Sequence, residues 1–210
     1  MIKKNLKTLI VMSIATLLPI FAGLILWDKL PDQFPIHWNG AGEIDGWCGK
    51  PFGVFGLPLI LLGLHWLTVL ITQSDPKKQN QSDKILQLTF WIIPTLNIAL
   101  SAFTYSAAMG KNVPVGTLSS LLIGVMFIII GNYMPKCRQN YTIGIKLPWT
   151  LNSEENWNKT HRLSGWLWVM GGIFITFAGF FNLFWPIVIS IVIMTATPFI
   201  YSYILHRKGI

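Results

Sequence analysis

The chain has 210 residues and a formal net charge of +8, yet only 11% of its residues are charged and 52% are hydrophobic. A soluble domain typically has about a quarter of its residues charged, so this composition argues against a soluble globular protein. The apolar residues form continuous blocks, and a helix needs about 20 residues to cross a bilayer. Because these blocks do not alternate with polar residues, we predict an all-α integral membrane protein rather than a barrel.

Six apolar blocks predict six transmembrane helices between a short basic head and a short basic tail. The predicted spans are residues 8–27, 51–73, 85–109, 115–130 with an extension to 133, 163–181 and 183–205. We divide the chain into an N-terminal two-span unit, residues 1–73, and a four-span unit, residues 85–210. Long polar loops fall at residues 28–50 and 131–162.

The basic residues predict how the chain is oriented in the membrane. Six spans place both termini on one side, and that side would carry 13 of the 16 Lys and Arg residues; Lys29, Lys50 and Lys111 lie on the other. Basic loops stay in the cytoplasm. We therefore predict cytoplasmic termini, an extracellular loop at 28–50 and a long cytoplasmic loop at 131–162. This asymmetry also accounts for the net charge, so we expect no direct nucleic-acid binding.

The extracellular loop is rich in proline and glycine. Pro31 and Pro35 lack an N–H and fix φ, so we predict an extended, stiff segment there. Residues 40–47, which follow it, are of types that form turns. The residue types that could ligate a metal are His37, Glu43, Asp45 and Cys48. Their spacing fits no standard zinc pattern, so we expect no metal or other cofactor. The alternative is a rigid aromatic and polar patch that meets a partner outside the cell.

The six spans contain no Asp or Glu, and His65 is their one clear ionisable group. Proton- and ion-coupled transporters keep carboxylates at mid-membrane, so this absence argues against a transporter or pump. We interpret His65 as a packed histidine that is hydrogen-bonded to a neighbouring helix, and a proton relay is the alternative.

Proline and glycine also mark the first half of the cytoplasmic loop. Pro135, Gly144 and Pro148 predict irregular or re-entrant backbone there. Asn152 with Glu155 three residues later predicts a helix start with a capping box, and this helix feeds into the fifth span.

Trp157 and His161 are spaced i, i+4 and therefore share one face of that helix, at the predicted membrane surface. The face serves either as an interfacial anchor or as a docking surface for a cytoplasmic partner. The sequence has no nucleophile–base–acid set, no phosphate-binding loop and no HExxH motif, so we expect no enzyme.

Two motifs resemble the signatures of one family. The outer loop contains Pro31-x-x-x-Pro35-Ile36-His37-Trp38-Asn39 and then Gly42-x-x-Asp45-Gly46, which resembles the small N-terminal domain of unknown function in the SdpI family. The inner loop contains Gly131-Asn132-x-Met134-Pro135-Lys136, Asn140, Gly144-Ile145-Lys146-Leu147-Pro148-Trp149-Thr150-Leu151 and Trp157-x-x-x-His161-Arg162, which resembles the second signature of that family. Both occur in the expected order, so the resemblance covers nearly the whole chain.

The resemblance implies a multispanning immunity protein of a Gram-positive bacterium that protects the cell against a secreted killing peptide. It also implies signalling, in which the protein holds a small helix-turn-helix repressor at the membrane once the toxin is present. The implied toxin-facing residues of the outer loop are Pro31, Pro35, His37, Trp38 and Asp45. The implied partner-facing residues of the inner loop are Asn132, Pro135, Asn140, Gly144, Lys146, Pro148, Trp149, Trp157, His161 and Arg162.

Two other classes stay open at this point. A small-molecule or peptide exporter is one, although the spans lack carboxylates and the chain lacks a nucleotide-binding motif. A metal-dependent membrane hydrolase that uses His37 or His161 is the other, and bound zinc would favour it.

Overall fold

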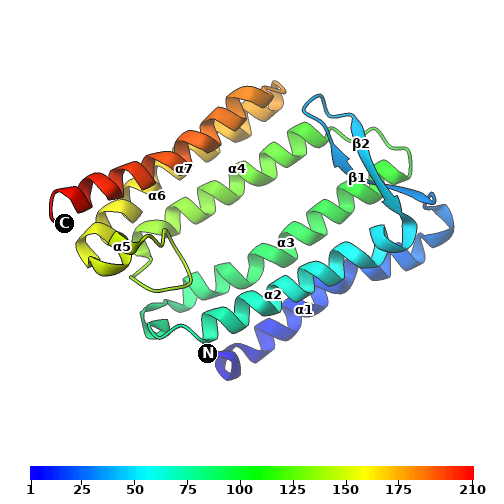
Figure 1. Ribbon diagram of the computed structural model, residues 1–210. Coiled ribbons are helices and arrows are strands. Elements are labelled where there is room, and N and C mark those ends of the chain that lie inside the picture. Colours follow the sequence, from blue (N-terminus) through cyan, green and yellow to red (C-terminus); the bar gives the residue numbers. More distant parts are fainter. The chain divides into compact units, whose positions relative to one another are not determined.

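The computed structural model describes residues 1–210 and is mostly helical (Figure 1). Six helices are long and apolar enough to cross a membrane, which confirms the prediction of a multi-pass membrane protein. They are α1 Ile2–Ile25, α2 Leu57–Gln73 with the preceding π-helical turn η2 Phe52–Gly56, α3 Asp83–Ala108, α4 Val115–Tyr133, α6 Glu154–Phe180 and α7 Phe184–Arg207. The fifth span begins earlier than predicted because the loop helix and the span form one continuous helix, α6.

The chain divides into two compact units. The first contains residues 1–73 and 86–115, and the second contains residues 74–85 and 116–210. Short one-turn elements join the helices: η1 Trp27–Lys29, η3 Lys78–Asn80, η4 Met134–Lys136 and the five-residue helix α5 Pro148–Asn152.

The prediction of an all-α chain is wrong for the outer loop, which folds into a β-hairpin (Figure 1). Strand β1, Gln33–Trp38, pairs antiparallel with β2, Ile44–Gly49, and an irregularity in the register follows Pro35. The Asn39 side chain closes the turn, because its Oδ1 accepts hydrogen bonds from the backbone N–H groups of Ala41 (2.9 Å) and Glu43 (3.1 Å). Gly42 follows with a φ of 83°, a left-handed conformation that glycine adopts readily.

A small apolar core holds the hairpin against the helices of the first unit. Leu30, Phe34, Val54 and Tyr105 are buried together, and the rings of Phe34 and Tyr105 meet edge to face with centroids 5.4 Å apart. Polar cross-links add to this packing inside the spans: Asn97 Nδ2 donates to the Thr16 carbonyl oxygen at 2.6 Å. Such satisfied polar contacts fix how membrane helices pack against one another.

The structure does not support the predicted hydrogen bond of His65 at one ring nitrogen. The side chain is buried, and its Nε2 atom has no hydrogen-bond partner. The packed position of His65 is as predicted, and its Nε2 atom forms no hydrogen bond with a neighbouring helix.

In the second unit, glycines set the close approach of α4 and α6. Gly165, Gly172 and Gly179 recur every seven residues along α6. A Cβ atom at Gly131 of α4 would lie 2.9 Å from the Gly165 carbonyl oxygen, so the two backbones touch where neither residue has a side chain. Small residues at an interface are the usual way for membrane helices to pack closely.

The start of α6 differs from the prediction by one residue. Ser153, rather than Asn152, is the N-cap, and its side chain accepts a hydrogen bond from the Asn156 N–H at 3.1 Å. Asn152 ends the preceding short helix α5 instead.

Candidate functional sites in the outer hairpin and the inner loop

The outer hairpin presents a hydrogen-bonded pair of polar side chains to solvent. His37 Nδ1 and Asp45 Oδ1 lie 2.6 Å apart across the two strands, with side chains 69% and 43% exposed. Pro31 is exposed before the first strand, and Trp38 is half-buried opposite Ile44. Pro35 is buried, so this one of the five outer candidates shapes the hairpin instead of facing outward.

Two apolar side chains that the motif did not single out complete the surface of the hairpin. Ile36 and Trp47 are both about half exposed on paired strands. An aromatic ring held on a strand and surrounded by polar groups is a common anchor in a binding surface. Trp47 was missed because a tryptophan near a span end also suits the membrane interface.

Asn140 organises the irregular part of the inner loop. Its Oδ1 accepts hydrogen bonds from the backbone N–H groups of Thr142 (2.9 Å) and Ile143 (2.7 Å). Its Nδ2 donates to the carbonyl oxygens of Arg138 (2.8 Å) and Ile143 (2.9 Å). The side chain is completely buried. One amide thus provides the hydrogen bonds that a helix or strand would otherwise supply.

Trp157 and His161 stack inside the second unit, with ring centroids 4.0 Å apart. Trp157 Nε1 donates to the Cys137 carbonyl oxygen at 2.7 Å, and His161 Nε2 accepts from the Ile145 N–H at 3.0 Å. Because a backbone N–H can only donate, Nε2 carries no proton. The hydrogen bond between Nδ1 and the Trp157 carbonyl oxygen, 2.8 Å, then makes Nδ1 the donor. His161 is therefore a neutral imidazole that bridges α6 and the loop.

Gly144 allows the loop to pass over this stacked pair. Its φ is 117°, and a Cβ atom there would lie 2.5 Å from His161 Nε2. Both the backbone conformation and the lack of space require glycine at this position.

Asp75, which belongs to no sequence motif, links the connector between α2 and α3 to the inner loop through hydrogen bonds. Its buried carboxylate accepts hydrogen bonds from the Tyr141 N–H (2.9 Å), the Thr142 hydroxyl (2.9 Å) and the Gln81 side chain (3.1 Å). An aspartate in a polar connector gives no sequence signal of such a role, because its partners in the inner loop, Tyr141 and Thr142, are more than 60 residues away in the chain.

The end of the inner loop contacts the end of α7 through hydrogen bonds and a ring stack. Trp149 Nε1 donates to the Ser202 hydroxyl at 2.8 Å, and the Trp149 ring stacks on His206. Asn156 Nδ2 donates to the carbonyl oxygens of Ser202 (2.9 Å) and Ile210 (3.1 Å). α5, α6 and the end of α7 therefore form one connected structure (Figure 1).

The structure separates the ten inner candidates into three groups. The exposed ones are Asn132, Pro135, Lys146, Pro148 and Arg162. The half-buried ones are Gly144 and Trp149, and the buried ones are Asn140, Trp157 and His161. The interpretation of Trp157 as an anchor at the membrane surface is wrong, because its ring is enclosed by the loop that α6 supports. The buried three shape the loop and do not reach a partner directly in this structure.

The two cysteines are free and differ in their surroundings. Burial raises the pKa of the Cys137 thiol to about 11, although a hydrogen bond from Asn140 opposes the shift. Burial also raises the pKa of Cys48, which is only half-buried. Both thiols are thus protonated at neutral pH and are poor nucleophiles. No three His, Cys, Asp or Glu side chains are grouped so that they could hold a metal ion.

Comparisons with known proteins match both loops. Residues 136–202 match the model of the SdpI/YfhL protein family, and residues 14–62 match that of a domain of unknown function, DUF1648. The chain is 29% identical over 192 residues to "Immunity protein SdpI" of Bacillus subtilis (strain 168), covering 91% of this chain and 89% of that protein. No solved structure matches. The resemblance predicted from the two motifs is thus confirmed by the match to the SdpI/YfhL family model and by the similarity to an SdpI immunity protein over most of the chain.

Proposed function

We propose that this chain is a membrane immunity protein that protects its cell against a secreted antimicrobial peptide. The observation that carries the proposal is the similarity to the immunity protein SdpI, which extends over 91% of the chain and includes both loops. Six candidate spans support an action at the membrane, where a killing peptide would do its damage. No catalytic step and no cofactor is part of this function.

The outer hairpin is the proposed toxin-facing surface. Paired strands and the buried Phe34 hold it rigidly, while Asp45, Ile36 and Trp47 offer a charge and apolar contacts to a peptide. A hydrophobic or cationic peptide suits this combination, because an exposed aromatic ring attracts both apolar groups and cations. In this arrangement the 28–50 loop and both termini have the predicted extracellular and cytoplasmic orientations.

The inner loop is the proposed reporter of toxin binding. Its exposed residues are available to a cytoplasmic partner such as a helix-turn-helix repressor, while the buried Asn140, Trp157 and His161 determine the shape of the loop. Toxin binding would change how α4 and α6, which flank the loop, pack together. Such coupling requires the toxin to bind one conformation of the protein more tightly than the other.

Survival of a sensitive host tests the proposal. The chain is expressed in a Gram-positive strain that lacks its own immunity gene, and purified killing peptide of the Sdp type is added. We expect growth only in cells that carry the protein. The double variant His37→Ala/Trp38→Ala should lose protection, whereas Lys111→Ala, an exposed change in the predicted extracellular connection at residues 110–114, should keep it.

Membrane levels of each variant are measured on the same cells. Full protection by His37→Ala/Trp38→Ala at normal levels would contradict the toxin-facing role of the hairpin. A repressor-controlled reporter, measured in parallel, separates protection from signalling: variants of the exposed inner residues, such as Lys146→Ala, should alter the reporter and leave survival unchanged.

A further inference from the structure

A basic hollow lies beside the first turns of α6. It has a volume of about 340 Å³ and is lined by Pro135 of η4 and by Asn158, Lys159 and Arg162 of α6. Lys136 follows Pro135 directly and adds to the basic surface, with its Nζ atom 5.1 Å from the centre of the Tyr133 ring. All of these residues belong to the second unit.

The hollow keeps an uncompensated positive charge. Glu155 is the carboxylate on this part of α6 that forms an ion pair, and its partner is Lys159, at 2.7 Å. Arg162 forms no ion pair or hydrogen bond within the chain, although it is exposed and lines the hollow. A free guanidinium offers a planar fork of N–H donors that matches a phosphate group. The Asn158 amide adds a neutral donor beside it.

The position of Arg162 along α6 indicates what kind of phosphate reaches it. Arg162 is the last charged residue of α6, and residues 163–180 are uncharged and continue as the span. Trp166 lies one turn further on the same side of the helix, with 71% of its surface exposed. Exposed tryptophan favours the level of the lipid headgroups, so Arg162 lies at the depth of the lipid phosphates.

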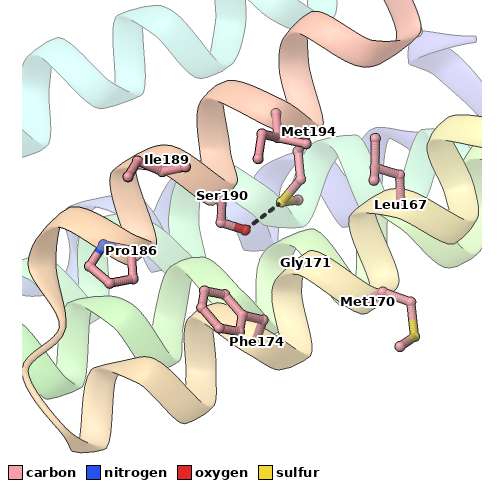
Figure 2. A pocket seen from close by; sticks show the side chains of 9 residues that line it. Leu167, Met170, Gly171, Phe174, Pro186, Ile189, Ser190 and Met194 are labelled. Carbon is pink, nitrogen blue, oxygen red and sulfur yellow. Dashed lines mark hydrogen bonds between the residues drawn. The ribbon is translucent and has the colours of Figure 1, made fainter.

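The membrane-embedded part of α6 has space beside it for acyl chains (Figure 2). A groove of about 420 Å³ between α6 and α7 begins at Leu167 and is lined by apolar side chains that include Met170, Phe174 and Ile189. Ser190 lies inside this groove but is directed to Met194 Sδ, at 3.7 Å, so the lining offers lipid tails an almost entirely apolar surface (Figure 2). The acyl chains of phospholipids beside α6 can cover this apolar surface, which a free phosphate ion cannot do.

We propose that the hollow binds the phosphate of an anionic phospholipid from the leaflet that adjoins the inner loop. Arg162 binds the phosphate oxygens through its guanidinium, Asn158 donates a further hydrogen bond, and Lys136 and Lys159 contribute positive charge. Basic pockets beside membrane helices are suited to anionic headgroups. This site is separate from the toxin-facing hairpin, and it exists whether or not the chain provides immunity.

Lipid titration of the purified chain tests the site. The protein in a nonionic detergent is titrated with dioctanoyl phosphatidylglycerol, with dioctanoyl phosphatidylcholine and with inorganic phosphate, and native mass spectrometry counts the bound molecules. We expect one tightly bound phosphatidylglycerol, with Arg162→Gln weakening its binding by about fivefold or more and Arg138→Gln by less than about twofold. Arg138→Gln is the matched control, because it removes an exposed charge from the same loop but not from the hollow.

Thermal unfolding without lipid shows whether each variant is folded, and Lys159→Gln replaces Arg162→Gln if the latter is not. Equal weakening by Arg138→Gln and the hollow variant would overturn the proposal, because only general surface charge would then act. Equally tight binding of phosphatidylcholine or of inorganic phosphate would overturn it as well. The hollow would then be left as a surface for an acidic protein partner.

Discussion

Single residues in the inner loop act mainly by completing hydrogen bonds that no secondary structure supplies. Asn140 bonds four backbone groups between residues 138 and 143, and His161 bonds the Ile145 N–H across the loop. A buried donor or acceptor that loses its partner carries the full cost of its desolvation. Substitutions at these positions should therefore destabilise the protein even though they lie far from the hairpin.

Replacing Asn140 tests this argument most simply. Asn140→Ala should lower the free energy of unfolding by about 1–3 kcal/mol, because the N–H groups of Thr142 and Ile143 lose their acceptor. The measurement is denaturant unfolding in detergent. Asn132→Ala, an exposed change near the start of the same loop, is the control and should change the value by less than about 0.5 kcal/mol. A loss no larger than that of the control would show that Asn140 does not hold the loop.

The neutral His161 ring gives a second prediction. His161→Phe keeps a ring to stack on Trp157 but leaves the Ile145 N–H buried without an acceptor, which should cost about 1–3 kcal/mol. His206→Phe is the matched control, since His206 is exposed and its contact with Trp149 is also a ring stack. Equal thermal stabilities of the two variants would mean that stacking, and not the hydrogen bond, is what His161 contributes.

At the scale of elements, the packing of α4 against α6 connects the membrane to the inner loop. The glycines of α6 meet α4 without side chains between the backbones, and a Cβ atom at Gly172 would lie 2.9 Å from the Ile128 nitrogen. This closeness makes the pair sensitive to small changes in volume. A change of packing here would move both flanks of the loop, which is the motion the proposed signalling needs.

Gly172→Leu should separate the two helices and destabilise the protein by about 1–3 kcal/mol or more. Gly63→Leu on α2 is the matched control, because a Cβ atom there meets nothing within 4 Å. Unfolding in detergent compares them. If Gly172→Leu were as stable as Gly63→Leu, the close α4–α6 contact would not contribute to stability.

The helices were predictable from the sequence, whereas the hairpin and the buried loop were not. Continuous apolar blocks determine where spans lie, so the six helices fall close to the predicted ranges. The hairpin depends on pairing between two segments, for example of Phe34 with Cys48. The sequence of either segment alone indicates only extended chain and a turn, so it does not predict the pairing. Likewise, the sequence pattern around Trp157 is the same whether its ring contacts lipid or a folded loop. The hydrogen bond to the distant Cys137 carbonyl oxygen shows that the ring contacts the loop.

For the molecule as a whole, the proposed function depends on which side of the membrane each loop faces. Burial raises the pKa of both cysteines, but Cys48 is half-buried in the hairpin and Cys137 is fully buried in the inner loop. A membrane-impermeant maleimide should therefore label Cys48 slowly in intact cells and Cys137 only after unfolding, with both rates rising at alkaline pH as thiolate forms.

An accessible reporter on the inner loop completes this test of orientation. Arg138→Cys, made with Cys48→Ser, places an exposed thiol there and should be labelled only after the cells are opened. Labelling of Arg138→Cys in intact cells would reverse the predicted orientation. The hairpin would then lie in the cytoplasm and could not meet a secreted peptide.

The most direct test of the immunity proposal is the membrane potential of cells under attack. A potential-sensitive dye is followed in a sensitive Gram-positive host, with and without this protein, while purified killing peptide of the Sdp type is added. We expect the potential to be held when the protein is present and to collapse when the protein is absent or carries His37→Ala/Trp38→Ala. An equal collapse in the presence of normal membrane levels of the wild-type protein would contradict protection against this class of peptide.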